Sequence, residues 1–444
     1  NMRREYLKEL LKKIEGCRIG IVGDFCLDAY WFINESKREI SLETGKMTVP
    51  IHEQKYSLGG AGNVANNLAA MGVRDVRAFG VIGVDPYGSK LVSLMQKAGI
   101  NTNNLLIQEE QWSTHVYVKP YIGDEEQSRI DFGNFNELSE NTSDALIIKL
   151  EREIDDLDLV IINQQVLSGI HTPYFRRRLI ELIAKFPDKK FITDSRHHIE
   201  EYTGTFRKMN DYEASLLAGL KKNLTDIILY EEVRQSAQTL YDRFHYPVFI
   251  TRGSRGSMVI NESGIIEIPG LMIISRIDTV GAGDSYLSGV AAALAIGADI
   301  ETAAELGTFV AGVTIQKLYQ TGTATPVEIL EIGADPDYIY HPELAEELRN
   351  ANYIDDTEIE LVVALPTKLK IRHAIFDHDG TISTLREGWE QIMSPMMVKA
   401  IMGDHYLDAD EALYMKVQTH VNEFINKTTG IQTLLQMKAL VTLV

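Results

Sequence analysis

The sequence predicts an α/β fold with a mainly parallel central sheet. From Val76 to about Ala324, apolar runs typical of buried strands alternate with helical segments. This alternation implies parallel βαβ units with right-handed crossovers. Two glycine turns, within Gly59 to Gly72 and within Asp278 to Ser285, each open a helix. The strands expected are Val76 to Val81, Leu159 to Ile162, Lys190 to Thr193, Val248 to Thr251 and Met258 to Ile260, and the helices are Gly88 to Ala98, Thr172 to Lys185 and Glu231 to Phe244.

Other segments are expected outside this regular pattern. Arg18 to Gly23 is predicted as a short buried strand that follows a first helix and ends at Asp24. Lys37 to Tyr56 alternates only loosely, so we expect its strands to lie outside the main sheet, in a small β lid. Val116 to Tyr121 and Gln127 to Phe132 are typical of an antiparallel pair.

The later glycine turn has the sequence Asp278-Thr279-Val280-Gly281-Ala282-Gly283-Asp284-Ser285. It follows an apolar run expected as a strand, Leu271 to Ile277, and leads into a helical segment, Tyr286 to Ile296. Backbone N–H groups at the start of a helix have no partner within the helix and favour an anion. The turn is therefore a candidate phosphate site, which Gly281 and Gly283 let a ligand approach closely.

Asp284 is unexpected there, because a carboxylate repels an anion. One reason for its presence is chemical: it takes the proton from a hydroxyl that attacks a bound phosphate. The alternative is an N-terminal cap in a tight strand-helix turn, since aspartate is a good cap. The turn taken alone favours neither.

The earlier turn, at Gly59 and Gly60, allows close backbone approach to a ligand, and Asn63 can both donate and accept hydrogen bonds with a polyol. Asp24 follows a buried strand, where open α/β sheets bind their ligands. It is therefore placed to bind sugar hydroxyls, or alternatively to cap the next turn.

Three further clusters lie where such a sheet would place ligands. Asn210-Asp211-Tyr212-Glu213 offers Glu213 to magnesium or its waters, with an exposed helix carboxylate as the alternative. Thr251-Arg252-Gly253-Ser254-Arg255-Gly256 either wraps nucleotide phosphates or forms a plain hairpin turn. The apolar helix expected over Thr308 to Leu318, with the loop Thr321 to Thr323, either flanks an adenine or packs on the sheet.

Composition excludes some classes of partner. The 444 residues include 44 basic and 63 acidic side chains, for a net charge of −19. This balance argues against nucleic acid or an anionic membrane as the main partner. The only cysteines are Cys17 and Cys26, which fits a reducing compartment. No apolar run is long enough to span a bilayer, and the start is not a secretory signal, so we expect a cytoplasmic protein.

Together and in this order, the motifs Gly59 to Asn63, Asn210 to Glu213, Thr251 to Gly253 and Asp278 to Asp284 resemble the ribokinase-like (PfkB) carbohydrate kinases over roughly residues 10–330. The resemblance implies a three-layer sandwich that binds ATP and Mg²⁺. It implies Asp284 as the catalytic base, an anion hole made of Gly281, Ala282 and Gly283, and a site for a monovalent cation such as K⁺ at Asp278 and the backbone of Val280. The implied sugar contacts are Asp24, Gly59, Gly60 and Asn63. The implied nucleotide contacts are Asn210, Glu213, Thr251, Arg252, Gly253, Gly256 and Gly322.

Within that family, the sequence is most similar to the heptose-7-phosphate kinase half of ADP-heptose synthases. The similarity lies in Gly23 to Trp31, which includes Asp28, in Arg129 to Phe132, and in Lys317-Leu318 with Gly322-Thr323. It implies Asp28 and Arg129 as substrate contacts.

Two departures concern the sugar end. Asn163-Gln164-Gln165 stands where that group has an aspartate, and Asp194-Ser195-Arg196 replaces its Asp-Pro-Lys. Arg196 either pairs with a sugar phosphate, for which its geometry is suited, or is a solvated loop arginine.

The C-terminal part differs in composition. Acidic residues and prolines crowd residues 329–368, which we interpret as an acidic linker with a short helix at Pro342 to Asn350, or alternatively as an acidic edge of the kinase domain 1–328. An expected strand, Ile371 to Phe376, then leads to Asp377-His378-Asp379. Two carboxylates two residues apart suit a nucleophile and a general acid around Mg²⁺.

This motif resembles the start of the haloacid dehalogenase-like phosphatases, with Asp377 as nucleophile and Asp379 as acid/base. Residues 385–443 are helical in pattern, like the start of a cap. The later motifs of that family have no room before Val444, so we expect 369–444 to be a truncated Rossmann-like phosphatase fragment without phosphatase activity.

The sequence thus predicts a kinase for a small sugar or sugar phosphate, most simply a heptose 7-phosphate at its anomeric hydroxyl. The alternatives are a kinase for another carbohydrate or a nucleoside, and a nucleotide-binding scaffold that no longer turns over. Outlying strands near Met47 and Tyr117 pair between subunits in related kinases, so we expect a homodimer.

Overall fold

The computed structural model describes residues 4–443 apart from 124, 225, 274–276, 318–321, 340–353, 355–360, 362–367, 369, 377–388, 407–410 and 429–432. The chain divides into two compact units. The first comprises residues 1–272 and 278–348, and the second comprises 273–277 and 349–444.

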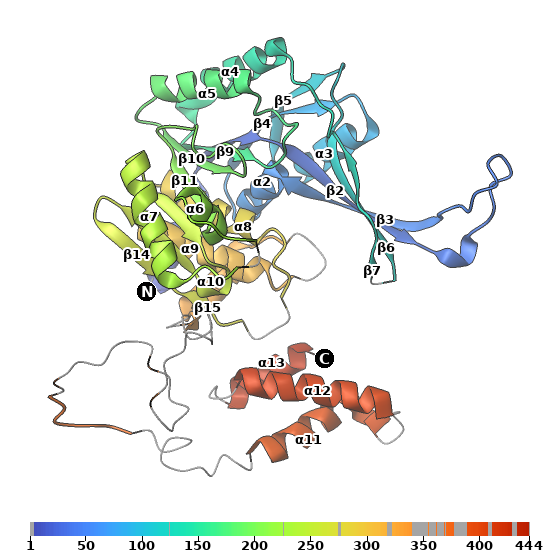
Figure 1. Ribbon diagram of the computed structural model, residues 1–444, viewed down its shortest axis with the longest axis vertical. Helices are drawn as coiled ribbons and strands as arrows, with labels where there is room; N and C mark the ends of the chain where they lie inside the picture. The colour runs from blue at the N-terminus through green and yellow to red at the C-terminus, as the bar shows by residue number, and fades with distance from the viewer. Residues whose placement is uncertain are drawn as a thin grey trace. The chain divides into compact units, whose positions relative to one another are not determined.

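A nine-stranded sheet forms the centre of the first unit (Figure 1). Its order is β14-β13-β12-β11-β10-β9-β1-β4-β5, and the pairs from β12 to β5 are parallel, whereas β12–β13 and β13–β14 are antiparallel. The prediction of a mainly parallel sheet is confirmed. The strands are β1 (Arg18–Gly23), β4 (Asp75–Gly83), β5 (Asn101–Gln108), β9 (Leu159–Gln164), β10 (Lys190–Ser195), β11 (Phe206–Asn210), β12 (Val248–Thr251), β13 (Ser257–Asn261) and β14 (Gly264–Ile268).

Helices cover both faces of this sheet. Side chains alternate between the two faces along each strand, so apolar side chains on both faces need to be covered. Ile19 and Ile21 of β1 join the core on one face, and Val22 joins the core on the other. The first face packs against α1 (Arg4–Ile14), α2 (Ala61–Ala70), α3 (Pro86–Lys97), α8 (Ala282–Ala295), α9 (Ile300–Thr314) and α10 (Pro326–Ala334). The second packs against α4 (Glu140–Glu153), α5 (Pro173–Lys185), α6 (Asp211–Leu217) and α7 (Tyr230–Phe244).

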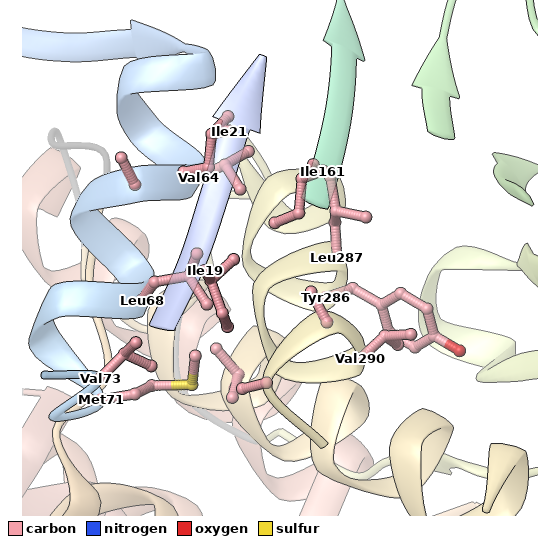
Figure 2. Close-up of a cluster of buried hydrophobic side chains, with 14 of the residues drawn as sticks. Ile19, Ile21, Val64, Leu68, Met71, Val73, Ile161, Tyr286, Leu287 and Val290 are labelled. Carbon is pink, nitrogen blue, oxygen red and sulfur yellow. The ribbon is translucent and has the colours of Figure 1, made fainter. Parts of the chain in front are cut away.

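The core between β1, α2 and α8 is the part of this packing that bears on the site. Figure 2 shows Ile19 and Ile21 of β1 facing Val64 and Leu68 of α2. Leu287 of α8 lies on the same side of the sheet. The hydroxyl of Ser288 also donates to the main-chain oxygen of Val64 at 3.2 Å, which joins α8 to α2. The two helices that follow the glycine turns are therefore fixed against each other.

The expected lid is a second sheet of five strands (Figure 1). β2 (Phe25–Ile33) pairs antiparallel with β3 (Ile51–Gly60) and parallel with β6 (His115–Ile122). β6 in turn pairs antiparallel with β7 (Glu125–Glu126) and β8 (Ile130–Phe132), as expected for this segment. The lid begins earlier than we predicted, since β2 starts directly after Asp24, and residues 37–50 contribute only an isolated bridge, Ile40 with Met47.

Two predicted elements differ in the structure. Of the strand expected over Leu271 to Ile277, the described residues contribute only Gly270–Leu271 as β15, which pairs with β16 (Tyr338–Ile339). The helix expected over Thr308 to Leu318 starts earlier and ends at Thr314. Apolar composition did not say where backbone partners end. It also did not ensure burial, since Met272 and Ile277 are exposed.

The first unit extends past residue 328, where we expected the linker to begin. Thr325 caps α10 and forms a capping box with Glu328, and Ile329 of α10 is buried in the core. The helix expected over Pro342 to Asn350 lies outside the described residues.

In the second unit, α11 (Trp389–Met402), α12 (Glu411–Thr428) and α13 (Thr433–Leu443) share a small core around Met397 and Phe424. Helices were expected here. The strand expected over residues 371–376 is not formed, because these residues are exposed and pair with no strand among the described residues. A strand without a neighbour leaves its backbone groups to water. No described helix is long and apolar enough to cross a membrane.

Arg207 provides a test of the packing. Its side chain is buried and donates to the main-chain oxygens of Ile199, Tyr202 and Thr205 at 2.9, 2.8 and 3.2 Å. Arg207→Met removes all three of these bonds, although the oxygen of Tyr202 keeps a bond of 3.0 Å from the hydroxyl of Thr205. We therefore expect the free energy of unfolding of the first unit to fall by about 3 kcal/mol.

Urea denaturation measures the effect. Arg243→Met is the matched control, because Arg243 is half exposed and pairs with Glu200 at the surface. Its loss should cost less than about 1 kcal/mol. Equal losses in the two variants would contradict the role assigned to Arg207.

Candidate active site

Asp284 lies in the first turn of α8, directly after the glycine turn. Its Oδ2 accepts a hydrogen bond of 2.9 Å from Nδ2 of Asn63, which comes from the first turn of α2. Burial raises the pKa of Asp284 to about 6, and the charge of Asp194 adds to the rise. The bond from Asn63 and the charges of Lys208 and Arg196 act in the opposite direction. A carboxyl with this pKa is mostly ionised at neutral pH, as a general base must be.

The turn before α8 leaves some, but not all, of the N–H groups of the predicted anion hole available to a ligand. Gly281 caps the helix with a left-handed backbone, φ 78°. The N–H of Ala282 donates to the main-chain oxygen of Thr279 at 3.1 Å, so it is already used. The N–H groups of Gly281 and Gly283 donate to no acceptor among the described residues. The predicted anion hole therefore keeps two donors.

Gly283 has a reason to be glycine that the sequence did not reveal. A Cβ at this position would lie 2.8 Å from Nζ of Lys208. Lys208 belongs to β11, is 7 % exposed and bonds to Oδ2 of Asp194 on β10 at 2.9 Å. Neither residue was predicted for the site. A lysine two residues before Asn210 was the available signal, because a strand was expected to precede Asn210, although its bounds were not predicted.

Arg196 and Glu213 lie near this ion pair. The charges of both Arg196 and Lys208 lower the pKa of Glu213, although burial raises it overall. Arg196 is exposed and forms no ion pair among the described residues. Glu213 is half-buried and forms a capping box with Asn210, with bonds of 2.8 and 2.9 Å. The capping box gives Glu213 a structural role, since it orders the start of α6. Its role toward magnesium stays a prediction.

Gln164 and Ser195, two residues at which the sequence departs from the heptose kinases, hold the turn that carries Arg196 in place. Oε1 of Gln164 accepts from Oγ of Ser195 at 2.8 Å and from the N–H of His197 at 2.9 Å. Its Nε2 donates to the main-chain oxygen of Val166 at 2.8 Å. Gln164 therefore ties the end of β9 to the residues on either side of Arg196.

Asp24 is 2 % exposed, and its carboxylate holds a loop. It accepts backbone N–H bonds from Gln165, Val166 and Ile170 at 3.1, 3.3 and 2.9 Å. Gly169 permits this approach, because a Cβ there would lie 2.1 Å from Oδ1 of Asp24. Asp24 thus anchors residues 165–170, a role that the sequence did not predict.

The predicted sugar residues lie around the start of the lid. Gly60 has φ 54°, and a Cβ there would meet the main-chain oxygen of Asp24 at 2.5 Å. A Cβ at Gly59 would meet Oδ2 of Asp28 at 2.9 Å. The main-chain oxygen of Asp24 thus requires glycine at position 60, and Gly59 leaves room for the carboxylate of Asp28. The charges of Asp24, Asp28, Asp284 and Arg196 all act on the buried thiol of Cys26, whose pKa burial raises.

Two cations on the lid are already paired. Nζ of Lys119 lies 3.5 Å from Oδ1 of Asp28, and burial raises the pKa of Asp28 although Lys119 and Arg129 lower it. Arg129 is half exposed and binds both oxygens of Asp131 at 2.6 and 2.8 Å, with its guanidinium over the ring of Tyr117.

The predicted nucleotide residues form the hairpin between β12 and β13. The side chain of Arg252 is buried, with Nη1 3.5 Å from Oε1 of Glu267, so the structure does not present it as a surface cation. Gly253 and Gly256 have positive φ, 58° and 84°. Arg255 fastens the hairpin to Asp211 at 3.1 Å. Thr251 donates to the main-chain oxygen of Met209, although at 3.4 Å the bond is long.

Gly322 and the cation residues flank the end of α9. A Cβ at Gly322 would lie 2.7 Å from the main-chain oxygen of Thr314. Asp278 donates through its N–H to Ile315 at 2.7 Å and accepts from the N–H of Val280 at 3.0 Å. Asp377 and Asp379 lie outside the described residues. Within the described part, no three His, Cys, Asp or Glu side chains are grouped to hold a metal ion.

Comparison with known proteins agrees with this geometry. A model described as pfkB family carbohydrate kinase matches residues 30–328. The chain is 29% identical over 408 residues to the bifunctional protein HldE of Desulfatibacillum aliphaticivorans, covering 90% of this chain and 78% of the relative. To HldE of Shewanella amazonensis it is 28% identical over 332 residues, covering 73% of this chain and 65% of that protein.

Solved structures share the fold. The ribokinase of Arabidopsis thaliana complexed with ribose and ATP gives a TM-score of 0.55 at 17% identity, covering 72% of this chain and 99% of that one. Phosphofructokinase-2 of Escherichia coli in complex with potassium gives 0.56 at 18%, covering 72% and 98%.

The sheet with helices on both faces, the β lid and an aspartate after a glycine turn are thus those of a ribokinase-like sugar kinase. The family match spans more than half of the chain. The chain belongs to the pfkB family of carbohydrate kinases.

The first test of the site concerns Asp284 and stability. Its folded pKa of about 6 lies above the ordinary 3.8, so stability from the protonated form is present below about 3.8 and lost as pH rises through 6. Asp284→Asn keeps an acceptor for Asn63 but never ionises. We expect its melting temperature to exceed that of the wild type at pH 7.5 and to converge with it toward pH 4. A difference that does not change with pH would contradict this.

The second test concerns the loop that Asp24 holds. Asp24→Asn replaces one accepting oxygen by an N–H₂ group, so the amides of Gln165, Val166 and Ile170 lose part of their acceptor. We expect hydrogen exchange over residues 165–170 to become about tenfold faster, because a lost bond is worth roughly 1.4 kcal/mol. Asp85→Asn, which changes a comparable cap on α3, is the control and should leave this loop unchanged. Unchanged exchange in Asp24→Asn would show that the loop is held by other contacts.

Proposed function

We propose that this kinase transfers the γ-phosphoryl group of ATP to the anomeric hydroxyl of a heptose 7-phosphate. The observation that carries the proposal is the half-buried Asp284 carboxylate, bonded to Asn63 beside a turn with two N–H donors to spare. A base and an anion site that adjoin each other suit attack by a hydroxyl on a bound phosphate.

In the proposed reaction, the acceptor oxygen attacks the γ-phosphorus in line while the bond from that phosphorus to the ADP oxygen breaks. Asp284 takes the hydroxyl proton as the new bond forms, and Asn63 holds the carboxylate in place. The N–H groups of Gly281 and Gly283 donate to the phosphoryl oxygens.

The residues present fit a Mg²⁺ ion held mainly by the substrate. Magnesium usually keeps several waters and binds through one or two carboxylates plus phosphate oxygens, so no protein cage is needed. Glu213 is the carboxylate that would face it, with Oε2 already bonded to the N–H of Asn210. When bound, the ion neutralises charge on the β- and γ-phosphates. The backbone of Val280 and the side chain of Asp278 would serve a monovalent cation such as K⁺.

The proposed acceptor site lies between the lid and the end of β1. Asn63 and the backbone of Gly59 and Gly60 would contact sugar hydroxyls, with Asp28 from the lid. The carboxylate of Asp24 would also accept a hydrogen bond from a sugar hydroxyl, through lone pairs that its bonds to backbone N–H groups leave unused. For the sugar phosphate, Arg196 is favoured over Arg129, because Arg129 is neutralised by both oxygens of Asp131 whereas Arg196 has no ion-pair partner in the described part.

The nucleotide would lie along the hairpin from Thr251 to Gly256 and the loop at Gly322, with Asn210 at the start of α6. The burial of Arg252 means that backbone groups at Gly253 and Gly256, rather than a guanidinium, would contact its phosphates.

The heptose assignment is supported by the HldE relatives and by the motifs shared with heptose-7-phosphate kinases. Gln164 and Arg196, where those kinases differ, favour a second candidate, a kinase for another carbohydrate or nucleoside on the same fold. For the second unit, we propose a haloacid dehalogenase-like domain around Asp377 and Asp379.

The experiment measures ADP release with MgATP against a panel of sugars, sugar phosphates and nucleosides. We expect turnover with a heptose 7-phosphate and a kcat about 10²- to 10⁴-fold lower in Asp284→Asn, the usual range for a lost general base. Asp299→Asn, which changes the N-cap of α9 outside the site, is the matched control.

Each outcome assigns the function. Turnover only with another acceptor, still lost in Asp284→Asn, keeps the mechanism and rejects the heptose. Full activity in Asp284→Asn rejects the base. ATP binding without turnover of any acceptor supports a scaffold.

A further inference from the structure

The ion pair of Lys208 with Asp194 lies at an unusual place. Lys208 is 7 % exposed and Asp194 is also 7 % exposed, so neither charge is solvated. Nζ of Lys208 lies 2.9 Å from Oδ2 of Asp194 and directly against the first turn of α8, where a Cβ at Gly283 would meet it at 2.8 Å. Taking two charges out of water is costly, and such a pair adds little stability by itself.

The position of the ammonium is also unfavourable for the helix. The N-terminus of a helix carries partial positive charge and favours anions over cations. A lysine held against it therefore adds to a positive potential that Arg196 and the N–H groups of Gly281 and Gly283 already create. The carboxylate of Asp194 compensates only part of this charge. The arrangement becomes favourable when an anion binds at the turn.

We propose that Lys208, held by Asp194, is a positioning residue that supplies fixed positive charge behind the glycine turn and acts on phosphoryl transfer through Asp284 and the bound phosphate. The inference rests on the proposed function, because it needs Asp284 to be the base. Lys208 requires no movement to act, since its ion pair fixes Nζ before substrate binds.

The effects of Lys208 and of Asp194 on Asp284 can be measured separately, because their charges are opposite. Asp284 is faced by Asp194 and Arg196 from β10 and the turn after it, by Lys208 from β11 and by Asn63 from α2. Glu213 of α6 acts on Lys208, and Cys26 of β2 lies within reach of Asp284. Lys208 lowers the pKa of Asp284, whereas Asp194 raises it. Breaking the pair from either side should therefore have opposite effects on the base.

The experiment compares Lys208→Met and Asp194→Asn, with MgATP and the best acceptor of the panel, as pH profiles of kcat. We expect the acidic limb to move to higher pH in Lys208→Met and to lower pH in Asp194→Asn. In Lys208→Met, kcat at its optimum should also fall about 10²-fold, as for other lost electrostatic contacts to a transition state. Lys185→Met, which removes a surface pair with Glu151, is the control and should change neither quantity.

A second readout needs no acceptor. The difference in melting temperature between the wild type and Asp284→Asn, followed with pH, reports the ionisation of Asp284. The same difference in a Lys208→Met background should reach its midpoint at higher pH, which also shows that the variant folds.

If the acidic limb of the pH profile of kcat stays in place, or moves in the same direction in both variants, the proposal is overturned. The ion pair of Lys208 with Asp194 is then purely structural. Full activity of Asp284→Asn would instead reject the base itself, so the two failures are distinguishable.

Discussion

The proposed mechanism depends on keeping one carboxylate, that of Asp284, charged where water is partly excluded. Burial favours the protonated form of Asp284 and raises its pKa. Asn63, Lys208 and Arg196 oppose that effect, and they come from α2, β11 and the turn after β10. No single segment of the chain contains this set. The sheet and its helices are needed to bring the four groups together.

Core packing sets the accuracy of that arrangement. α2 and α8 both lie on the face of β1 that Ile19 and Ile21 occupy, and Ser288 bonds across to Val64 (Figure 2). The hydrogen bond from Asn63 to Asp284 therefore joins two helices that apolar contacts already hold. A close-packed interior transmits small changes of volume to its surroundings. Substitutions in this core should consequently alter the site as well as stability.

Several glycines proved to have a different purpose from the one that their motifs suggested. The turn residues were expected to make room for a ligand. In the structure, Gly283 makes room for Lys208, and Gly169, for which no role was predicted, makes room for Asp24. The polar side chains admitted in this way are buried, and each would be costly there without its partner. Close approach at these glycines thus serves an internal ion pair and an anchor.

The sequence by itself determined the α/β class, the lid and the two glycine turns, because strand and helix periodicity, glycine and capping residues act locally. It also predicted Asp284 and Asn63 as site residues, and the structure joins the two by a hydrogen bond. Only the tertiary structure decided that Lys208 faces Gly283, that Asp24 anchors residues 165–170 and that Arg252 is buried. These facts depend on pairings between residues far apart in the chain, and the charge and burial of each group follow from neighbours that no local pattern specifies.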